Sequence, residues 1–280
     1  MKYLALIQCA VIIVFFFTGK AFPGVDVAVY NDTSYPNGGA WAEGIEAIKA
    51  MLDTYGYSHE DITPEVVNGT NDLNSLYKVI LFGGGWAAGY NTYITSTGYA
   101  NLRNFVANGG GYFGICAGSY FPSDLVVWKP NYTTPREIYN YPFDLFKGRG
   151  IGAVLGIKAW TSPTGCSTGI TEGAAMTTVK INNTVLPDVS PQLPILYYGG
   201  PLFIPSQELK DQVIVVATYE VPGKPSDASP AMILFPYGEG MVFLTGPHPE
   251  VSFDTETCTL YYDNETWKLM DSVMNLLILP

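Results

Sequence analysis

The chain has 280 residues, of which 48% are hydrophobic and only 14% are charged, and its formal net charge at pH 7 is −11. A chain of this length and apolar content can bury a sizeable core, as one large α/β domain or as two small ones. The acidic balance, with Lys and Arg nowhere clustered, argues against nucleic acid and anionic membrane surfaces as partners.

The first 21 residues differ in character from the rest of the chain. Lys2 precedes an apolar run over residues 3–17, and small residues follow at Gly19 and Ala21. This order predicts a secretory signal peptide over residues 1–21, because the run is shorter than the ~20 residues of a bilayer span. No later segment is apolar enough to span a bilayer, so we expect a protein that is secreted or lies in the secretory-pathway lumen. Five N-x-S/T glycosylation sequons agree with secretion, at Asn31, Asn68, Asn131, Asn182 and Asn264.

The first half of the mature chain alternates between predicted strands and helices. Hydrophobic periodicity predicts strands over residues 25–30, 62–67 and 77–82, and helices over 41–55 and 99–108. A further strand runs into Cys116, and a helix is expected from about Ala117. This alternation predicts an open parallel sheet covered on both faces, with ligands bound at the carboxyl ends of the strands. Three such ends, after Tyr30, after Phe82 and at Cys116, are loops rich in Gly or Asn, and we expect them to converge.

The second half contains more strands than helices and is interrupted by Pro and Gly. We predict strands over residues 150–157, 176–182, 195–198 and 213–219, a hairpin with arms at 231–235 and 241–244, and a final helix from about Asn264. The chain shows no linker run and no internal repeat. Residues 22–280 are therefore interpreted as a single domain with strand-rich insertions in its second half.

Cys116 lies in the sequence GICAG, with Gly114 and Gly118 two residues away on either side. This is the spacing of a G-x-S-x-G nucleophile elbow with a thiol in place of the hydroxyl. A nucleophile at a strand-to-helix corner needs small neighbours, and a helix N-terminus behind it favours a thiolate. The alternative is a glycine-flanked buried cysteine that packs as a small hydrophobe.

The sequence offers a base, an acid and backbone donors for such a nucleophile. His248 follows a predicted strand between two prolines, so the segment is extended and Glu250 lies on the same face of it. This pattern predicts a general base held in one tautomer by a carboxylate, against the alternative of an ordinary loop histidine. The N–H groups of Gly84, Gly85 and Ala117 are candidates for an oxyanion hole, although a glycine run is also an ordinary strand-end turn.

The mature chain retains three cysteines, an odd number for a secreted protein. If Cys166 pairs with Cys258, Cys116 is left free, as a nucleophile requires; alternatively all three are free and buried. Two histidines and three scattered cysteines make no zinc site of recognisable spacing, so we expect no metal and no cofactor.

Three motifs occur in the order found in the class I glutamine amidotransferase-like superfamily: FGGG at residues 82–85, GICAG at 114–118 and HPE at 248–250. Within that superfamily the chain resembles the biotin–protein ligase N-terminal domain family, through VYND at 29–32, GGGYFGICAGSY at 109–120 and YYGGP at 197–201. The resemblance implies a flavodoxin-like three-layer α/β sandwich with a mostly parallel central sheet. It also implies a Cys116–His248–Glu250 triad that attacks an amide or related carbonyl through a thioester.

The sequence departs from the superfamily pattern at Tyr120, where glutamine-using members carry Gln in G-x-C-x-G-x-Q. This departure puts glutaminase activity in doubt. The hypothesis is a secreted cysteine amidase or hydrolase acting on a small-molecule or peptide amide, with Tyr120 and Asn31 lining the substrate pocket. The rival hypothesis is a catalytically inactive binding module on the same scaffold.

Overall fold

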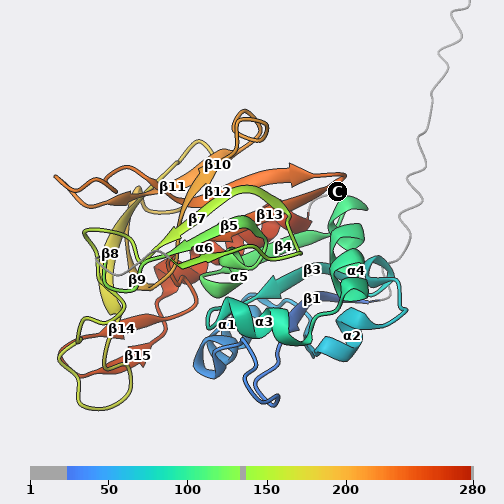
Figure 1. The fold of residues 1–280 in the computed structure, drawn as a ribbon, viewed down its shortest axis with the longest axis horizontal. Helices are drawn as coiled ribbons and strands as arrows, with labels where there is room; N and C mark the ends of the chain where they lie inside the picture. Colours follow the sequence, from blue (N-terminus) through green and yellow to red (C-terminus); the bar gives the residue numbers. More distant parts are fainter. Residues whose placement is uncertain (1–23, 133–136, 279–280) are drawn as a thin grey trace, which may run out of the picture.

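The computed structural model describes residues 24–132 and 137–278 (Figure 1). The predicted signal peptide, residues 1–21, lies outside the described residues. None of the helices in the described ranges combines the length and the apolar character needed to cross a bilayer.

A nine-stranded sheet forms the centre of the molecule, in the order β2-β1-β3-β4-β13-β12-β11-β8-β9. The first five of these strands run parallel, namely β2 (His59–Ile62), β1 (Val25–Tyr30), β3 (Tyr77–Phe82), β4 (Gly111–Ile115) and β13 (Gly240–Thr245). The remaining four pair antiparallel, namely β12 (Pro230–Tyr237), β11 (Ile214–Glu220), β8 (Ala174–Ile181) and β9 (Gln192–Tyr198). The predicted α/β sandwich is confirmed, but its sheet is mixed: the parallel arrangement covers only half of it.

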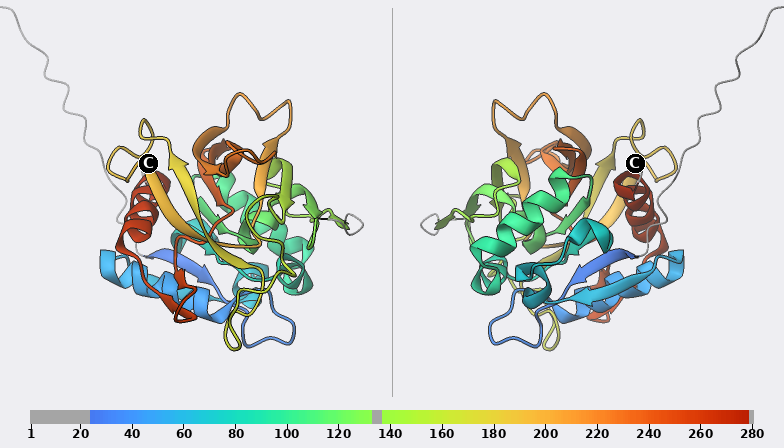
Figure 2. Two further views of the ribbon diagram at one scale, coloured as in Figure 1. Left: turned by 90° about the vertical axis from the view of Figure 1, so that its left-hand side faces the viewer. Right: turned by 90° about the vertical axis from the view of Figure 1, so that its right-hand side faces the viewer.

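Helices cover both faces of the parallel half, as Figure 2 shows. Strand β3 explains why, because its continuous apolar run is buried on both sides. Val79 and Leu81 share a core with α1 (Ala42–Tyr55) and α6 (Asn264–Ile278), whereas Ile80 and Phe82 share another with α3 (Ala87–Tyr93) and α4 (Ser96–Ala107). The final helix predicted from about Asn264 is confirmed, because α6 begins at that residue.

A second sheet packs over the α3 and α4 side. Its order is β10-β7-β5-β6, formed by β10 (Leu202–Pro205), β7 (Phe146–Gly152), β5 (Ser123–Trp128) and β6 (Glu137–Tyr139). Phe146 of this sheet lies 5.5 Å, between ring centroids, from Phe235 of β12. A short hairpin of β14 (Ser252–Asp254) and β15 (Thr259–Tyr261) follows the last strand of the central sheet. These strands are the insertions expected in the second half.

Two predicted elements differ in the structure. The strand predicted over residues 62–67 is wrong, because β2 ends at Ile62 and the helix α2 (Pro64–Asn68) follows. Pro64 explains this, since its fixed φ and missing N–H suit the first turn of a helix. A 3₁₀ turn, η1 (Leu73–Ser75), precedes β3. The strand predicted over residues 150–157 instead spans Phe146–Gly152, where Gly152 ends it.

Candidate functional site

The loops after β1, β3 and β4 meet at one edge of the central sheet, as predicted. The Trp86 N–H donates to the Gly39 carbonyl at 2.7 Å, and the Trp41 N–H donates to the Gly84 carbonyl at 2.9 Å. The Gly118 N–H, after β4, donates to the Gly83 carbonyl at 3.0 Å. Backbone hydrogen bonds therefore join the three strand ends into one platform, the usual ligand position in sheets of this kind.

Cys116 occupies a strained corner between β4 and the one-turn helix α5 (Ala117–Tyr120). Its φ of 49° and ψ of −100° lie in a region that non-glycine residues seldom adopt. The flanking glycines permit this corner, because a Cβ on Gly114 would lie 2.3 Å from the Gly118 carbonyl oxygen and one on Gly118 would lie 2.1 Å from that of Phe82. The local geometry is that of a nucleophile elbow. Because α5 spans only four residues, its dipole adds less to thiolate stability than a full helix would.

His248 and Glu250 form a buried pair on the segment that follows β13. The backbone N–H of His248 donates to the Leu196 carbonyl at 2.8 Å, which fixes the segment against β9. The imidazole Nδ1 donates to Glu250 Oε1 at 2.7 Å, and both side chains are at most 1% exposed. The Trp267 indole N–H in turn donates to the Glu250 backbone carbonyl at 2.8 Å, anchoring the segment to α6. The expectation that these two side chains share one face is confirmed.

The electrostatics of this pair favour a charged imidazole. Burial is the largest single influence and lowers the pKa of His248, but the Glu250 carboxylate and the Cys116 sulfur both act to raise it. Together they raise the pKa of His248 to about 10. Cys116 and His248 also line one cavity.

The contact between thiol and imidazole is looser than a hydrogen bond. Cys116 Sγ donates to the Tyr198 carbonyl at 3.5 Å, and His248 Nε2 has no hydrogen-bond partner within the described part of the chain. Catalytic hydrogen bonds are often long before substrate binds and tighten afterwards.

The candidate oxyanion donors occupy different positions. Gly85 and Ala117 line the same cavity as Cys116, whereas Gly84 packs against the imidazole of His248. Gly85 needs to be glycine, because its φ is +134° and a Cβ there would lie 2.0 Å from the Gly39 carbonyl oxygen. The backbone hydrogen bonds of the described loops include none donated by these three residues. Of the three, Gly85 and Ala117 are the ones that line the cavity beside Cys116.

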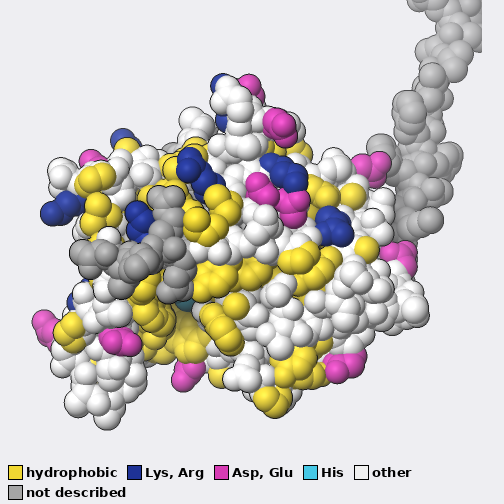
Figure 3. All heavy atoms as spheres, viewed as in Figure 1, with side chains coloured by type: hydrophobic (Ala, Val, Ile, Leu, Met, Phe, Trp, Pro, Cys, Tyr) yellow, Lys and Arg dark blue, Asp and Glu magenta, His cyan; other side chains and the backbone are white. Residues whose placement is uncertain are grey.

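Two cavities adjoin the Cys116 side chain. The larger, of about 350 Å³, is mostly aromatic, and no acidic or basic side chain of the described residues lines it. Besides Cys116 it is lined by Gly85, Trp86, Ala87, Ala117, Tyr120, Val126, Trp128, Tyr139, Tyr141, Trp160, Tyr198 and Gly199. We call it the aromatic cavity. The second, of about 270 Å³, is lined by Gly38, Gly39, Ala40, Trp41, Gly85, Trp86, Cys116, Trp160, Tyr198 and His248. We call it the glycine cleft. Figure 3 shows hydrophobic side chains gathered across the middle of one face of the molecule.

Of the two residues predicted to line the pocket, Tyr120 and Asn31, only Tyr120 lines a cavity beside Cys116. Tyr120 lines the aromatic cavity, and its hydroxyl donates to the Gly199 carbonyl at 2.9 Å. Asn31 lines neither cavity, because its side chain donates to Asp61 at 2.8 Å. Its neighbour Asp32 contributes instead: the buried carboxylate accepts the N–H groups of residues 39 and 40 at 2.9 and 2.8 Å, and so shapes the glycine cleft.

Sequence reasoning missed most of the aromatic cavity. Trp128 comes from β5, Trp160 from the loop after β7 and Tyr198 from β9. Trp160 stacks on Tyr198 at 5.0 Å and meets Trp128 edge-on at 5.9 Å. Only the YYGGP motif pointed to any of these positions, and it did not indicate their neighbours.

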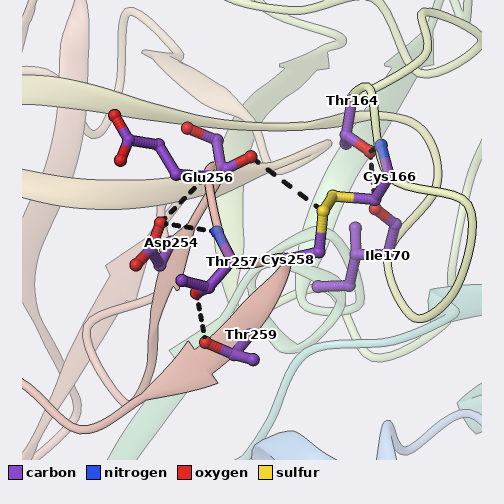
Figure 4. Close-up of a disulfide and its surroundings, with 9 residues drawn as sticks. Thr164, Cys166, Ile170, Asp254, Glu256, Thr257, Cys258 and Thr259 are labelled. Atoms are coloured by element: carbon purple, nitrogen blue, oxygen red, sulfur yellow. Dashed lines mark hydrogen bonds between the residues drawn. A yellow bond between two sulfur atoms is a disulfide. The ribbon is translucent and has the colours of Figure 1, made fainter.

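The remaining cysteines form a disulfide, shown in Figure 4. Cys166 and Cys258 are joined with an S–S distance of 2.06 Å, linking the long loop after β7 to the turn between β14 and β15. Cys116 is the free cysteine of the described residues. Within residues 24–132 and 137–278, no three His, Cys, Asp or Glu side chains gather in a way that could hold a metal ion.

Comparison with known proteins places the chain among relatives of one family. The family profile described as biotin-protein ligase, N terminal, matches residues 25–275. The biotin–protein ligase of Schizosaccharomyces pombe is 28% identical over 200 residues, which make up 71% of this chain and 30% of that protein. An uncharacterized protein of Chlamydia muridarum is 27% identical over 192 residues, 67% of this chain and 65% of that protein. The chain thus spans less than two thirds of either relative.

Solved structures share the fold at low sequence identity. The GH42 β-galactosidase Gan42B of G. stearothermophilus superposes with a TM-score of 0.53 and 14% identity, covering 90% of this chain and 30% of that one. A cytoplasmic protein of Salmonella typhimurium superposes with a TM-score of 0.51 and 11% identity, covering 90% and 98%. At such identities the likeness concerns the fold alone. The family profile, in contrast, covers nearly all of the described residues, and the chain therefore belongs to the biotin–protein ligase N-terminal family.

Proposed function

We propose that this protein is a cysteine-dependent hydrolase that cleaves an amide or a related carbonyl compound. The observation that carries the proposal is the position of Cys116, strained at an elbow beside the buried His248–Glu250 pair. Backbone strain of this kind is concentrated at functional sites. A sulfur, an imidazole and a carboxylate in this arrangement support nucleophilic catalysis.

The proposed reaction has two steps. The Cys116 proton passes to His248 Nε2 before the reaction, as the raised pKa of that imidazole favours, and the resulting thiolate attacks the carbonyl carbon while the N–H groups of Gly85 and Ala117 stabilise the negative oxygen. The C–N bond then breaks as the imidazolium returns its proton to the leaving nitrogen, which leaves a thioester on Cys116. Water, deprotonated by His248, hydrolyses that thioester and releases the acid. Glu250 holds the imidazole orientation in both steps.

We also propose that the protein works outside the cytosol, on a small-molecule or peptide amide. The Cys166–Cys258 disulfide supports this, because such bonds persist in oxidising compartments. The leader-like residues 1–21 and the sequons agree with it. Secretion is tested by mass spectrometry of the N-terminus of the protein recovered from culture medium.

A binding module on the same scaffold is the second candidate. It is favoured by Tyr120, which occupies the cavity where glutamine-using members of the superfamily carry Gln, and by the loose contact between Cys116 and His248. In that case the aromatic cavity would hold a ligand without chemical change.

Iodoacetamide labelling of the native mature chain separates the two candidates, because Cys116 is its free thiol. Rates are measured across pH for wild type, His248→Ala and His59→Ala. The last is a matched control, since His59 pairs with Asp53 at the surface. If the proposal holds, labelling is rapid below the pH at which a free thiol ionises, and only His248→Ala slows it. Equal, slow labelling in all three, with no amide or ester turnover lost in Cys116→Ala, would favour the binding module.

A further inference from the structure

The two cavities beside Cys116 are distinguished by His248. The imidazole lines the glycine cleft and does not line the aromatic cavity. The residues that line both are Gly85, Trp86, Cys116, Trp160 and Tyr198, so the reacting carbonyl lies where the two cavities meet. A substrate bound there has one half in each cavity.

The chemistry assigns the two halves. The group that protonates the leaving nitrogen must lie within hydrogen-bond reach of it, and in the proposed mechanism that group is His248. The leaving group therefore occupies the glycine cleft. The acyl group, which stays attached to Cys116 as the thioester, extends into the aromatic cavity.

The lining of the aromatic cavity defines what acyl group fits. Trp128 and Tyr141 line this cavity alone, and Trp160 and Tyr198 are shared with the glycine cleft. Among the residues that the structure describes, no charged side chain lines it to pair with an ionised substrate. The Tyr120 hydroxyl is already bonded to the Gly199 carbonyl, so this polar group is largely occupied. Its volume of about 350 Å³ lies within the ~300–1,000 Å³ of small-molecule sites.

We propose that the aromatic cavity is the acyl subsite, and that it selects a neutral acyl group carrying an aromatic or similarly bulky apolar ring. This inference rests on the proposed hydrolase function and specifies its substrate class. It also explains why Tyr120 stands where glutamine-using members of the superfamily carry Gln. A free glutamine substrate would have its charged ammonium and carboxylate desolvated in this cavity without partners, at a large energetic cost.

Two isomeric amides test the assignment. N-methyl-2-phenylacetamide carries its ring on the acyl side, and N-benzylacetamide carries the same ring on the leaving side. We expect kcat/KM to favour the first by at least roughly tenfold, because only the first buries its phenyl ring in the aromatic cavity. In Trp128→Ala the preference should fall towards unity, whereas Tyr55→Ala, a surface aromatic change, should retain it. Equal rates, or a preference for the benzyl isomer, would overturn the acyl assignment while leaving the hydrolase proposal intact.

Binding supplies a readout that does not depend on turnover. In Cys116→Ala, calorimetry should show N-methyl-2-phenylacetamide binding that weakens at least several-fold when Trp128→Ala or the cavity-filling Val126→Phe is added. Binding unchanged by both additions would reject the aromatic subsite. If binding follows the prediction but neither amide is cleaved and Cys116 labels slowly, the hydrolase proposal and the acyl assignment both fail, and a ligand-binding cavity remains.

Discussion

We predict that Gly84→Ala disables the site by displacing His248. A Cβ at residue 84 would lie 2.4 Å from His248 Cε1, whereas ordinary contact begins near 3.4 Å, so the ring must move by about 1 Å. It cannot move freely, because it is buried and held by the 2.7 Å hydrogen bond to Glu250. Misplacing a catalytic group by about 1 Å can cost on the order of 100-fold in rate.

The neighbouring Gly83→Ala is a matched control. Its Cβ would lie 3.2 Å from the Cδ1 atoms of Ile45 and Ile48, which are the ends of flexible side chains that can yield. Both variants are assayed for amide turnover, for the iodoacetamide labelling rate of Cys116 and for thermal unfolding. We expect Gly84→Ala to lose about 100-fold in turnover and to label more slowly, and Gly83→Ala to lose little. If Gly84→Ala turns over and labels as fast as Gly83→Ala, the imidazole does not act on Cys116 and the reasoning is refuted.

Three further predictions concern the supports of the site. Replacing Cys166 and Cys258 by Ser should lower the unfolding free energy in urea by about 2–5 kcal/mol, because the bond closes a loop with a sequence separation of 92; a loss well under 1 kcal/mol would contradict this. The pKa of His248 rises on folding from 6.5 to about 10, so its imidazolium stabilises the fold fully below pH 6.5 and this contribution is lost as the pH rises towards 10. The unfolding free energy of the wild type should fall between pH 6.5 and about 10, and the fall should be smaller in Glu250→Gln. If the two proteins give parallel curves of unfolding free energy against pH, the His248–Glu250 pair is not the source of the fall. Trp267→Phe removes the N–H donated to the buried Glu250 carbonyl and should cost about 1–3 kcal/mol of stability, with a fall in kcat at nearly constant KM. A change in KM alone would show that this indole does not position the acid.

The parts of the site that were predictable depend on short spacings. Gly114 and Gly118 flank Cys116 at two residues, and each glycine is required by a close backbone approach within or next to the elbow. His248 and Glu250 are also two residues apart, and the prolines hold that segment extended. Interactions this local are specified by neighbouring residues, so the sequence alone indicated them.

The parts that were missed depend on contacts between distant segments. Asn31 was expected in the pocket, yet Asp61, on the adjacent strand, takes its side chain, and Asp32 shapes the site instead. Sequence pattern does not show which of Asn31 and Asp32 faces the site, because strand alternation only places neighbouring side chains on opposite sides. The strand predicted over residues 62–67 failed for a local reason, the helix-starting Pro64.

The amino-acid sequence by itself determined the alternating strands and helices of the first half, the elbow at Cys116 and the shared face of His248 and Glu250, since each follows from backbone preferences over a few residues. Only the tertiary structure decided that the sheet continues with four antiparallel strands, that Cys166 pairs with Cys258, and that aromatic rings from β5, β9 and the loop after β7 enclose one cavity. The physical reason is that these features arise from packing between segments many residues apart, where side-chain volume and burial, rather than spacing along the chain, select the partner.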